Sequence, residues 1–472
     1  METVDTATIP ASLADLPTFR LDEDEEINPA FVDAVSDAVA AGDRSRVALL
    51  VEDLHQADLG TLLEALEHDA RPRLIELLGR DFDFSALTEV DDAVREEILE
   101  ELETETVAEG MRDLDSDDAV YILEDLTDAD QAEILRHLPA VERVALQRAL
   151  DYEEDSAGRL MQTEFIAVPP FWTVGQTIDF MRETEELPET FYEIFVVDPG
   201  IRLLGSVPLD KLLRTKRPVR ISEIMVDEPD QVEATDHQED VARRFQRYNL
   251  VSAAVIDEAG RLVGVITIDD VVDVIEEEAD AEIKALGGVK PDEELSDNVW
   301  EIARGRFTWL FVNLLTAILA SAVIGFFEKS LEKMVALAVL MPIVASMGGN
   351  AGTQSMTVAV RALATRNLGR SNVRRIVARE VLVGLINGLA FALVMGVVAV
   401  VWFGLPSLGP VIGLALVVTL ASAAFGGIVI PVMLDRFGID PAVASGPFVT
   451  TITDVVGFFA FLGIATLWFG LL

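Results

Sequence analysis

The sequence contains no cysteine and only four histidines, His55, His68, His137 and His237, among 472 residues. Without cysteine the chain has no disulfide, no thiolate metal site and no cysteine nucleophile. All four histidines precede residue 301, after which the long apolar stretches begin. No His-Glu-Xaa-Xaa-His motif of an intramembrane metalloprotease is therefore present, and we expect the chain not to be an enzyme.

Basic residues are also scarce, because six lysines and thirty arginines stand against 82 acidic residues. Residues 1–300 hold 25 basic and 75 acidic side chains, a formal charge of −50, whereas the remainder carries +4. Nucleic acid binding draws its affinity from Lys and Arg contacts, so we expect no nucleic acid partner and expect divalent cations instead. The same acidity is typical of a salt-accumulating halophile, so acidity alone does not identify sensor residues.

The first residues, METVDTATIP, lack the basic and then apolar pattern of a signal peptide, so we expect residues 1–300 to remain in the cytoplasm. Long uncharged stretches follow, at 307–327, 334–360, 381–434 and from Pro441 onward, the last broken by Asp454. Roughly 20 residues cross a bilayer at about 1.5 Å per residue, so the third stretch holds two spans with a turn at 405–410. The sequence therefore predicts an α-helical membrane domain of five helices over 306–472.

Arginines gather in the connection between the second and third predicted spans. They are Arg361, Arg366, Arg370, Arg374, Arg375 and Arg379. By the positive-inside rule this connection and the N-terminus are cytoplasmic and the C-terminus is extracellular, in a multi-pass protein of the cytoplasmic membrane. Topology explains the cluster, and a lipid or ligand site is the alternative.

Residues 30–150 repeat a short helical phrase, at 53–66, 113–126 and 126–138. In each copy, apolar residues recur at helical spacing after an acidic start that can cap a short helix. We expect an all-α superhelical domain over 30–150, preceded by an acidic tail over 1–29. One acidic start contains Asp115, Asp117 and Asp118, which are either solvated caps or cation ligands.

The pattern changes after residue 150 to strands that alternate with helices, and the order occurs twice, over 151–220 and 221–278. Each copy has an apolar strand, a turn with Asp and Gly, a second strand and a helix. The second copy, with LVGVIT at 262–267 followed by Asp269 and Asp270, resembles a cystathionine-β-synthase-type (CBS) domain, and the first does so more loosely. Such α/β pairs are regulatory modules, and an adenine nucleotide is one ligand that the resemblance implies.

The segment 269–305 connects this pair to the first predicted span and begins as an acidic amphipathic helix. Asp270, Asp273, Glu277 and Glu278 project carboxylates from adjacent turns, so the helix repels itself. The segment is either a solvated linker or a control element whose charge is neutralised by bound divalent cations.

Asp454 is the one charged residue within the predicted spans. A carboxylate there costs at least ~2.5 kcal/mol unless it faces water, a cation or a partner. No Lys or Arg lies in a predicted span, so the alternatives are a protonated, hydrogen-bonded side chain and an ion path. Thr450, Thr451 and Gly457 fall on the same helical face, which suits a water-lined ion path.

The second predicted span supplies further oxygen atoms. It contains Pro342, Gly348, Gly349 and Gly352. We expect these residues to loosen the helix where it lines a cavity, so that backbone carbonyls are offered to an ion. Asn350 and Gln354 add amide oxygens, and Glu380, at the start of the third span, is either a mouth residue or an interfacial salt bridge. An inventory of oxygen ligands favours a hard cation such as Mg2+, passing largely hydrated.

Motifs and domain order together resemble the MgtE family of magnesium channels over residues 30–472. The motifs are YEEDSAGRLM at 152–161, GGNAGTQ at 348–354 and GPFVTTITDVVGF at 446–458. The resemblance implies a homodimer with its pore on the two-fold axis and Mg2+ bound at Asp454. Gly349, Asn350, Thr450 and Thr451 match the rest of that path. Many members carry Asn where this chain has Thr353.

The resemblance also implies that the connecting helix is a plug. It closes the pore when cytoplasmic Mg2+ bridges its acids to those of the other cytoplasmic domains. Asp270, Asp273, Glu278 and Glu282 match the acidic positions of that helix, and Ala281 occupies a place that is often acidic.

We therefore expect a Mg2+-selective channel that cytoplasmic Mg2+ closes. An ion-coupled transporter of Mg2+, Mn2+ or Co2+ with CBS regulation is the alternative, and the oxygen inventory does not separate the two. A CBS-regulated anion channel is disfavoured, because its path would carry basic or amide donors whereas the charge in these spans is acidic.

Overall fold

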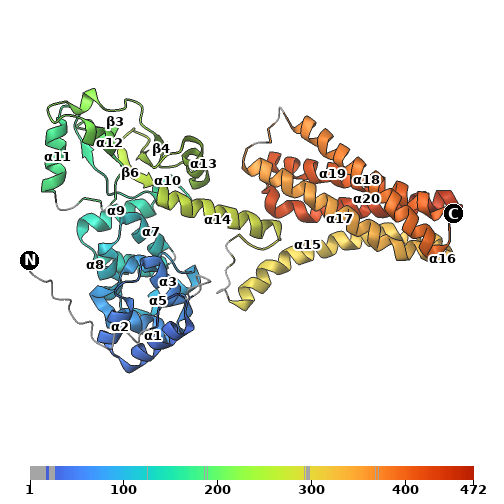
Figure 1. Ribbon diagram of the computed structural model, residues 1–472, viewed down its shortest axis with the longest axis horizontal. Helices are drawn as coiled ribbons and strands as arrows, with labels where there is room; N and C mark the ends of the chain where they lie inside the picture. The colour runs from blue at the N-terminus through green and yellow to red at the C-terminus, as the bar shows by residue number, and fades with distance from the viewer. Residues whose placement is uncertain are drawn as a thin grey trace, which may run out of the picture. The chain divides into compact units, whose positions relative to one another are not determined.

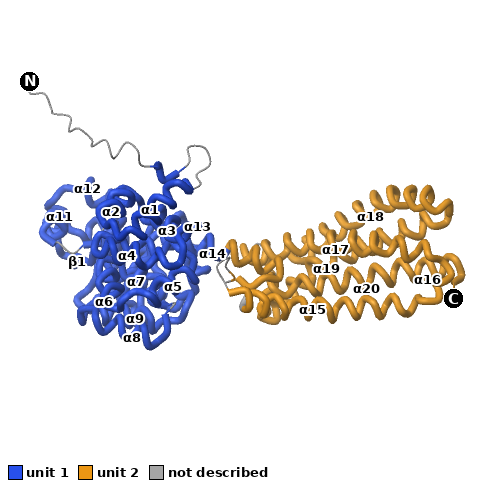
Figure 2. Tube along the Cα trace, turned by 90° about the horizontal axis from the view of Figure 1, so that it is seen from below, with its two compact units in different colours: residues 1–278 blue, residues 279–472 orange. Residues whose placement is uncertain are grey.

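A computed structural model describes residues 17–20, 27–124, 126–184, 187–188, 190–291, 293, 298–366, 368–369 and 372–471. Most of the predicted tail over 1–29, part of the predicted connection over 269–305, and Arg370 lie outside these residues. The chain divides into two compact units, residues 1–278 and 279–472 (Figure 2).

Unit 1 begins with short helices packed around one apolar core (Figure 1). They are α1 (Pro29–Ala41), α2 (Arg44–Val51), α3 (Gln56–Ala65), α4 (Arg71–Leu78), α5 (Asp92–Glu101), α6 (Thr104–Gly110), α7 (Ser116–Glu124), α8 (Asp128–His137) and α9 (Ala140–Leu150), with 3-10 turns at His68–Ala70, Gly79–Asp81, Phe84–Leu87 and Met111–Asp113. The three repeated phrases of the sequence form α3, α7 and α8, which confirms the prediction of an all-α region.

Polar side chains fix the ends of these helices. Asp43 accepts a hydrogen bond from the backbone of Arg46 at the start of α2, and Thr127 does the same for Asp130 at the start of α8. Arg71 closes the end of α3, because its guanidinium donates to the carbonyls of Leu63 and Leu66 at 3.0 and 3.2 Å.

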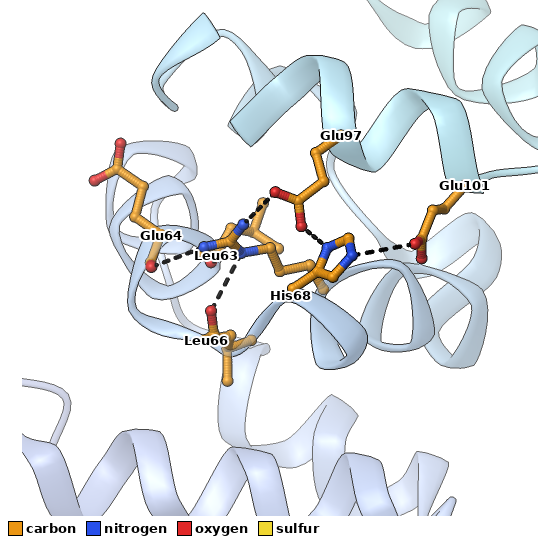
Figure 3. A network of polar contacts seen from close by, with 7 residues as sticks. Leu63, Glu64, Leu66, His68, Glu97 and Glu101 are labelled. Atoms are coloured by element: carbon orange, nitrogen blue, oxygen red, sulfur yellow. Dashed lines mark hydrogen bonds and ion pairs between the residues drawn. The ribbon is translucent and has the colours of Figure 1, made fainter. Parts of the chain in front are cut away.

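The same guanidinium reaches Glu97 of α5 at 3.1 Å. His68 lies between Glu97 and Glu101, as Figure 3 shows, and its Nε2 is 3.5 Å from Glu101. Arg71 of α4 therefore links the end of α3 to α5.

Two similar α/β repeats follow in unit 1. The first contains β1 (Ala167–Val168), α11 (Val174–Glu183), β2 (Glu193–Val197), β3 (Leu203–Pro208) and α12 (Leu209–Arg214); the second contains β4 (Gln231–Glu233), α13 (Gln238–Tyr248), β5 (Ser252–Ile256) and β6 (Leu262–Thr267); α10 (Ala157–Leu160) precedes both, and a 3-10 turn at Ile221–Glu223 lies between them. Each repeat has a three-stranded sheet whose first pair is parallel and whose second pair is antiparallel. Phe195, Ala254 and Leu262 share one buried cluster that joins the two sheets. The predicted duplication is confirmed.

The described residues of unit 2 contain five helices long and apolar enough to cross a membrane, as predicted. They lie within α15 (Val299–Gly325), α17 (Val335–Ala364), α18 (Val373–Phe403), α19 (Leu408–Arg436) and α20 (Pro441–Phe469), and the short α16 (Glu328–Lys333) joins the first two. α19 is the most enclosed of them, since it packs against α17, α18 and α20 (Figure 1). The acidic helix α14 (Ile268–Leu286) begins in unit 1 and ends in unit 2, well before residue 305.

The expectation that α17 is loosened by its glycines and proline is wrong. The helix is continuous from Val335 to Ala364 with Pro342 inside it, so the carbonyls around its glycines are used in helical hydrogen bonds. Pro342 has no N–H and frees the carbonyl one turn before it, outside the glycine motif. The glycines instead allow close packing: a Cβ on Gly348 would lie 2.7 Å from the Thr419 methyl group, and one on Gly427 of α19 would lie 2.7 Å from the Gly352 carbonyl. Small residues let apolar helices approach closely where no hydrophobic effect drives them together.

Candidate functional site

Asp454 lies in the middle of α20, and its side chain is half-buried. Among the described residues, no hydrogen bond or ion pair engages its carboxylate. The alternative of a carboxyl group satisfied by protein hydrogen bonds therefore has no support in the described part of the chain. A carboxylate at this depth needs water, a cation or a second protein surface.

The neighbours of Asp454 along α20 hold that helix against α17. Thr453 is buried, with its Cβ 3.5 Å from a Cβ placed on Gly348 and its methyl group 3.0 Å from one on Gly352. One turn further along α20, a Cβ placed on Gly457 would lie 3.3 Å from the methyl group of Thr419 of α19. This small-residue seam fixes the rotation of α20 and so leaves Asp454 at its edge.

Polar side chains also lie on these two contacting helices, outside the seam, and together we call them the polar row. It consists of Asn350, Thr353 and Gln354 on α17 and of Thr450 and Asp454 on α20. All except the half-buried Asp454 are exposed in the single chain. The Thr450 and Thr451 hydroxyls donate to backbone carbonyls one turn earlier, at 3.0 and 2.6 Å, which leaves their oxygen lone pairs free to accept.

The other two residues proposed for this path are placed differently. Gly349 has open space around it, with nothing within 4 Å of an added Cβ. Glu380 is 13% exposed at its side chain, and its carboxylate accepts from Arg379 at 3.0 Å and from Ser355 at 3.4 Å. Both of the expectations for Glu380 remain open, since an ion pair at a helix start is compatible with either.

A second candidate site lies in unit 1, where two acidic helix starts face each other. Asp117 and Asp118 are in the first turn of α7, and Asp269 and Asp270 are in the first turn of α14. Carboxylates are locally favourable at these positions because a helix N-terminus carries partial positive charge. The tertiary fold then brings the two starts together and makes them repel, since Asp117 faces Asp270 and Asp118 faces Asp269 and Asp273.

Burial and mutual repulsion raise the pKa values in this acid cluster. Burial, and then the charges of Asp270 and Asp118, hold the pKa of Asp117 well above its usual range. Burial, and then Asp115 and Glu89, raise the pKa of Asp118 to about 6. Burial and the neighbouring Asp269 raise the pKa of Asp270 to about 7, although the Thr267 hydroxyl donates to it at 3.0 Å.

The fold therefore gathers five predicted regulatory residues, which are Asp115, Asp117, Asp118, Asp270 and Asp273. Glu278 follows Glu277 at the edge of this cluster, whereas Glu282 lies in unit 2 and binds Arg361. Sequence reasoning missed Glu89 and Asp269, because nothing in the sequence shows which acids a superhelix will place opposite α14. Within the described residues, no three acidic or histidine side chains converge closely enough to form a metal site.

A small cavity lies where the two α/β repeats meet. Its volume is about 10 Å3, and its described lining includes Phe165, Tyr192, Glu164 and Glu193 but no basic side chain. Burial raises the pKa of Glu193, and the Ser252 hydroxyl donates to it at 2.9 Å.

Comparisons with known proteins agree with this domain order. The model of a divalent cation transporter family, MgtE, matches residues 341–464, that of the MgtE intracellular N domain matches residues 54–155, and that of the CBS domain matches residues 157–217 and 221–277. These matches confirm the predicted fold class: a helical domain, a CBS pair and a multi-pass membrane domain.

Relatives match over most of the chain. A magnesium transporter MgtE from Thermus thermophilus is 39% identical over 327 residues, which cover 69% of this chain and 72% of that protein. One from Bacillus subtilis is 29% identical over 417 residues, 88% of this chain and 92% of that protein. The crystal structure of the cytosolic domain of the Mg2+ channel MgtE in complex with ATP is 31% identical with a TM-score of 0.49, over 52% of this chain and 99% of that one.

The relatives are membrane transporters, and the expectation that this chain is not an enzyme is confirmed. The matched segments include both the seam around Asp454 and the acid cluster of unit 1. With 39% identity across more than two thirds of both proteins, this chain belongs to the MgtE family of divalent cation transporters.

Proposed function

We propose that this protein is a Mg2+-selective channel of the cytoplasmic membrane that cytoplasmic Mg2+ closes. The observation that carries the proposal is the Asp454 carboxylate in the middle of a membrane helix, without a hydrogen bond or ion pair among the described residues. The relatives that support Mg2+ as the ion are both named magnesium transporters.

The path supplies oxygen atoms alone. Asp454 offers a carboxylate, Thr450 and Thr451 offer hydroxyl lone pairs, and Asn350 and Gln354 offer amide oxygens. Mg2+ gives up its water reluctantly, so we infer that these groups contact its water shell. The carbonyl of Gly349 is used within α17, and its open surroundings give the ion room instead.

The polar row supports a homodimer. In one chain this row is exposed, and polar side chains facing lipid are costly. A second copy with its row opposite the first would enclose a path lined by two Asp454 carboxylates. The positive-inside rule orients each copy with its N-terminus in the cytoplasm and its C-terminus outside.

Closure follows from the electrostatics of the acid cluster. When Mg2+ is scarce, the charges of Asp117, Asp118 and Asp270 repel one another and destabilise the close approach of the first turns of α7 and α14. Cations that bind between these helices favour the packed arrangement by their differential affinity for it. The donors are oxygen atoms, as Mg2+ prefers, and Asp115, Asp273 and Glu278 extend the set. Because no three of the described acids converge, bridging through bound water fits this cluster better than a closed cage.

An adenine nucleotide does not fit the small cavity where the two CBS repeats meet. A ligand of this size needs several hundred Å3, whereas the cavity has about 10 Å3. Its described lining has two glutamates and no basic side chain, so it offers no charge partner for phosphates. We therefore do not assign this cavity as a nucleotide site.

Flux through purified, reconstituted protein tests the ion path. We expect Asp454→Asn to reduce Mg2+ uptake into liposomes by at least about tenfold, because the ion loses its one full countercharge in the membrane. Asp435→Asn is the matched control: it removes an exposed carboxylate from the end of α19 and should leave uptake unchanged. Wild-type flux in Asp454→Asn would refute the assignment.

An ion-coupled transporter remains the second candidate, supported by the same oxygen atoms. Uptake measured with and without proton and sodium gradients separates the two. A channel follows the Mg2+ gradient and membrane potential alone, whereas a coupled carrier stops when the driving ion is at equilibrium.

A further inference from the structure

Glu282 has a different environment from the other acids of α14. Its carboxylate accepts a hydrogen bond from Arg361 of α17 at 2.5 Å, within unit 2. The Glu282 side chain is 26% exposed and that of Arg361 is 63% exposed. The pair therefore joins the end of the acidic helix to a membrane helix at a partly enclosed surface.

Local charges explain why Glu282 gains from this partner. Glu282 lies near the C-terminus of α14, where the helix dipole disfavours negative charge, and it follows Glu278 by one turn, which adds like-charge repulsion. Arg361 lies in the last turn of α17, where positive charge is favourable. The guanidinium thus relieves a carboxylate that is otherwise badly placed.

An apolar contact lies one turn from the ion pair. Ala285 is 3% exposed and belongs to a buried cluster with Met356 and Val360 of α17 and with Ala442 and Val449 of α20. These are the two helices that carry the polar row. The end of α14 therefore has a specific seat, defined by the pair and by Ala285, on the helices of the ion path.

We propose that Glu282 and Arg361 form a latch that holds the end of α14 in this seat when the channel is closed. In this role Glu282 is a positioning residue and not a ligand of regulatory Mg2+. The latch rests on the proposed function, and it assigns the last step of closure to a contact within one chain.

The test measures the cytoplasmic Mg2+ concentration that half-closes the full-length channel in a reconstituted bilayer. Glu282→Gln and Arg361→Gln should each raise this concentration by about two- to fivefold, the range expected when an exposed ion pair is lost. Asp280→Asn and Arg375→Gln are matched controls, because they remove exposed charges on α14 and α18 that are not part of the seat. The exchanged pair, Glu282→Arg with Arg361→Glu, should restore the wild-type value.

A Mg2+ ligand behaves differently. If Glu282 held the ion, removing the nearby cation with Arg361→Gln would lower the half-closing concentration, and the exchanged pair would stay defective. Either result would overturn the latch.

A second measurement does not depend on flux. Since the chain has no cysteine, Ala285→Cys with Val360→Cys reports the seat by cross-linking in the presence of Mg2+. Adding Glu282→Gln or Arg361→Gln should reduce the yield at least about twofold. An unchanged yield would overturn the latch even if Mg2+ closes the channel. Reduced yields in a channel that Mg2+ does not close would support the latch and refute Mg2+ gating.

Discussion

Neighbouring residues in the glycine motif of α17 have opposite surroundings. Gly348 is buried against Thr419 and Thr453, whereas Gly349 has nothing within 4 Å of an added Cβ. The same residue type therefore serves packing at one position and open space at the next. Which role a glycine has is decided by the helix opposite it.

This difference predicts unequal effects of one added methyl group. Gly348→Ala should destabilise the membrane domain by about 1–3 kcal/mol, because its Cβ would lie 2.7 Å from a buried threonine methyl group. Gly349→Ala should be tolerated. Thermal unfolding of both variants in detergent measures the difference, and equal unfolding temperatures would contradict the packing assignment.

The raised pKa values of Asp118 and Asp270, about 6 and about 7, predict a pH-dependent stability. The native state holds these protons more tightly than the unfolded state, so stability is greatest near and below pH 4 for these groups and is lost as pH rises through 6 to 7. Without Mg2+, we expect the acid cluster to cost on the order of 4 kcal/mol at pH 8 relative to pH 5.

The first unfolding transition of the full-length protein in detergent and chelator checks this sign. Its temperature should be higher at pH 5 than at pH 8, and saturating Mg2+ should narrow the gap by stabilising the ionised form. A lower temperature at pH 5 would mean that the carboxylates are stabilised as anions by partners.

At the scale of elements, α14 has two different sets of neighbours along one helix. Its first turns carry Asp270 and Asp273 toward α7 in unit 1, and its last turn carries Glu282 and Ala285 to the seat in unit 2. The acids of its start are favourable for the isolated helix and unfavourable in the fold. This conflict is what a bound cation would relieve.

Removing the charge repulsion between the first turns of α7 and α14 should reduce the stabilisation of the protein by Mg2+. We expect Asp117→Asn with Asp270→Asn to unfold at a higher temperature than the wild type when Mg2+ is absent. The rise in unfolding temperature on adding millimolar Mg2+ should be at least about half smaller than in the wild type, because fewer charges remain to neutralise. Asp280→Asn, on the same helix but exposed, should retain the full increment. A wild-type increment in the double variant would place the regulatory ion elsewhere.

At the scale of the whole molecule, the chain is built for two solvents. Residues 1–300 carry a formal charge of −50, while unit 2 exposes large apolar side chains along α15 and α18. Lipid suits those apolar faces, but it does not suit the polar row of α17 and α20.

The polar row therefore predicts contact with a second copy. Asn350→Cys should give disulfide-linked dimers in membranes, because the chain has no competing cysteine and the row would lie at the two-fold axis. Leu393→Cys, on an exposed apolar part of α18, should cross-link far less because it faces lipid. A monomer by light scattering, or equal cross-linking at both positions, would contradict the homodimer.

Local rules explain which parts of this architecture the sequence predicts. The five spans follow from length and apolarity, the α/β duplication from its repeated order, and the short helices from their acidic starts. Asp454 is singled out because a charge in an apolar run is rare. The expectation that α17 is loosened is wrong. Local propensity treats glycine and proline as helix breakers, and it does not count the side chains of neighbouring helices that pack against the glycines.

The sequence by itself determined the elements, the membrane segments and the residue most costly to bury, because these depend on interactions within a few turns of the chain and on transfer between solvents. The tertiary structure decided which acids meet, that Glu89 and Asp269 join Asp118, and that Glu282 leaves the acids to bind Arg361. Those outcomes depend on contacts between segments far apart in the chain. Charge repulsion acts through space, and no spacing along the sequence encodes it.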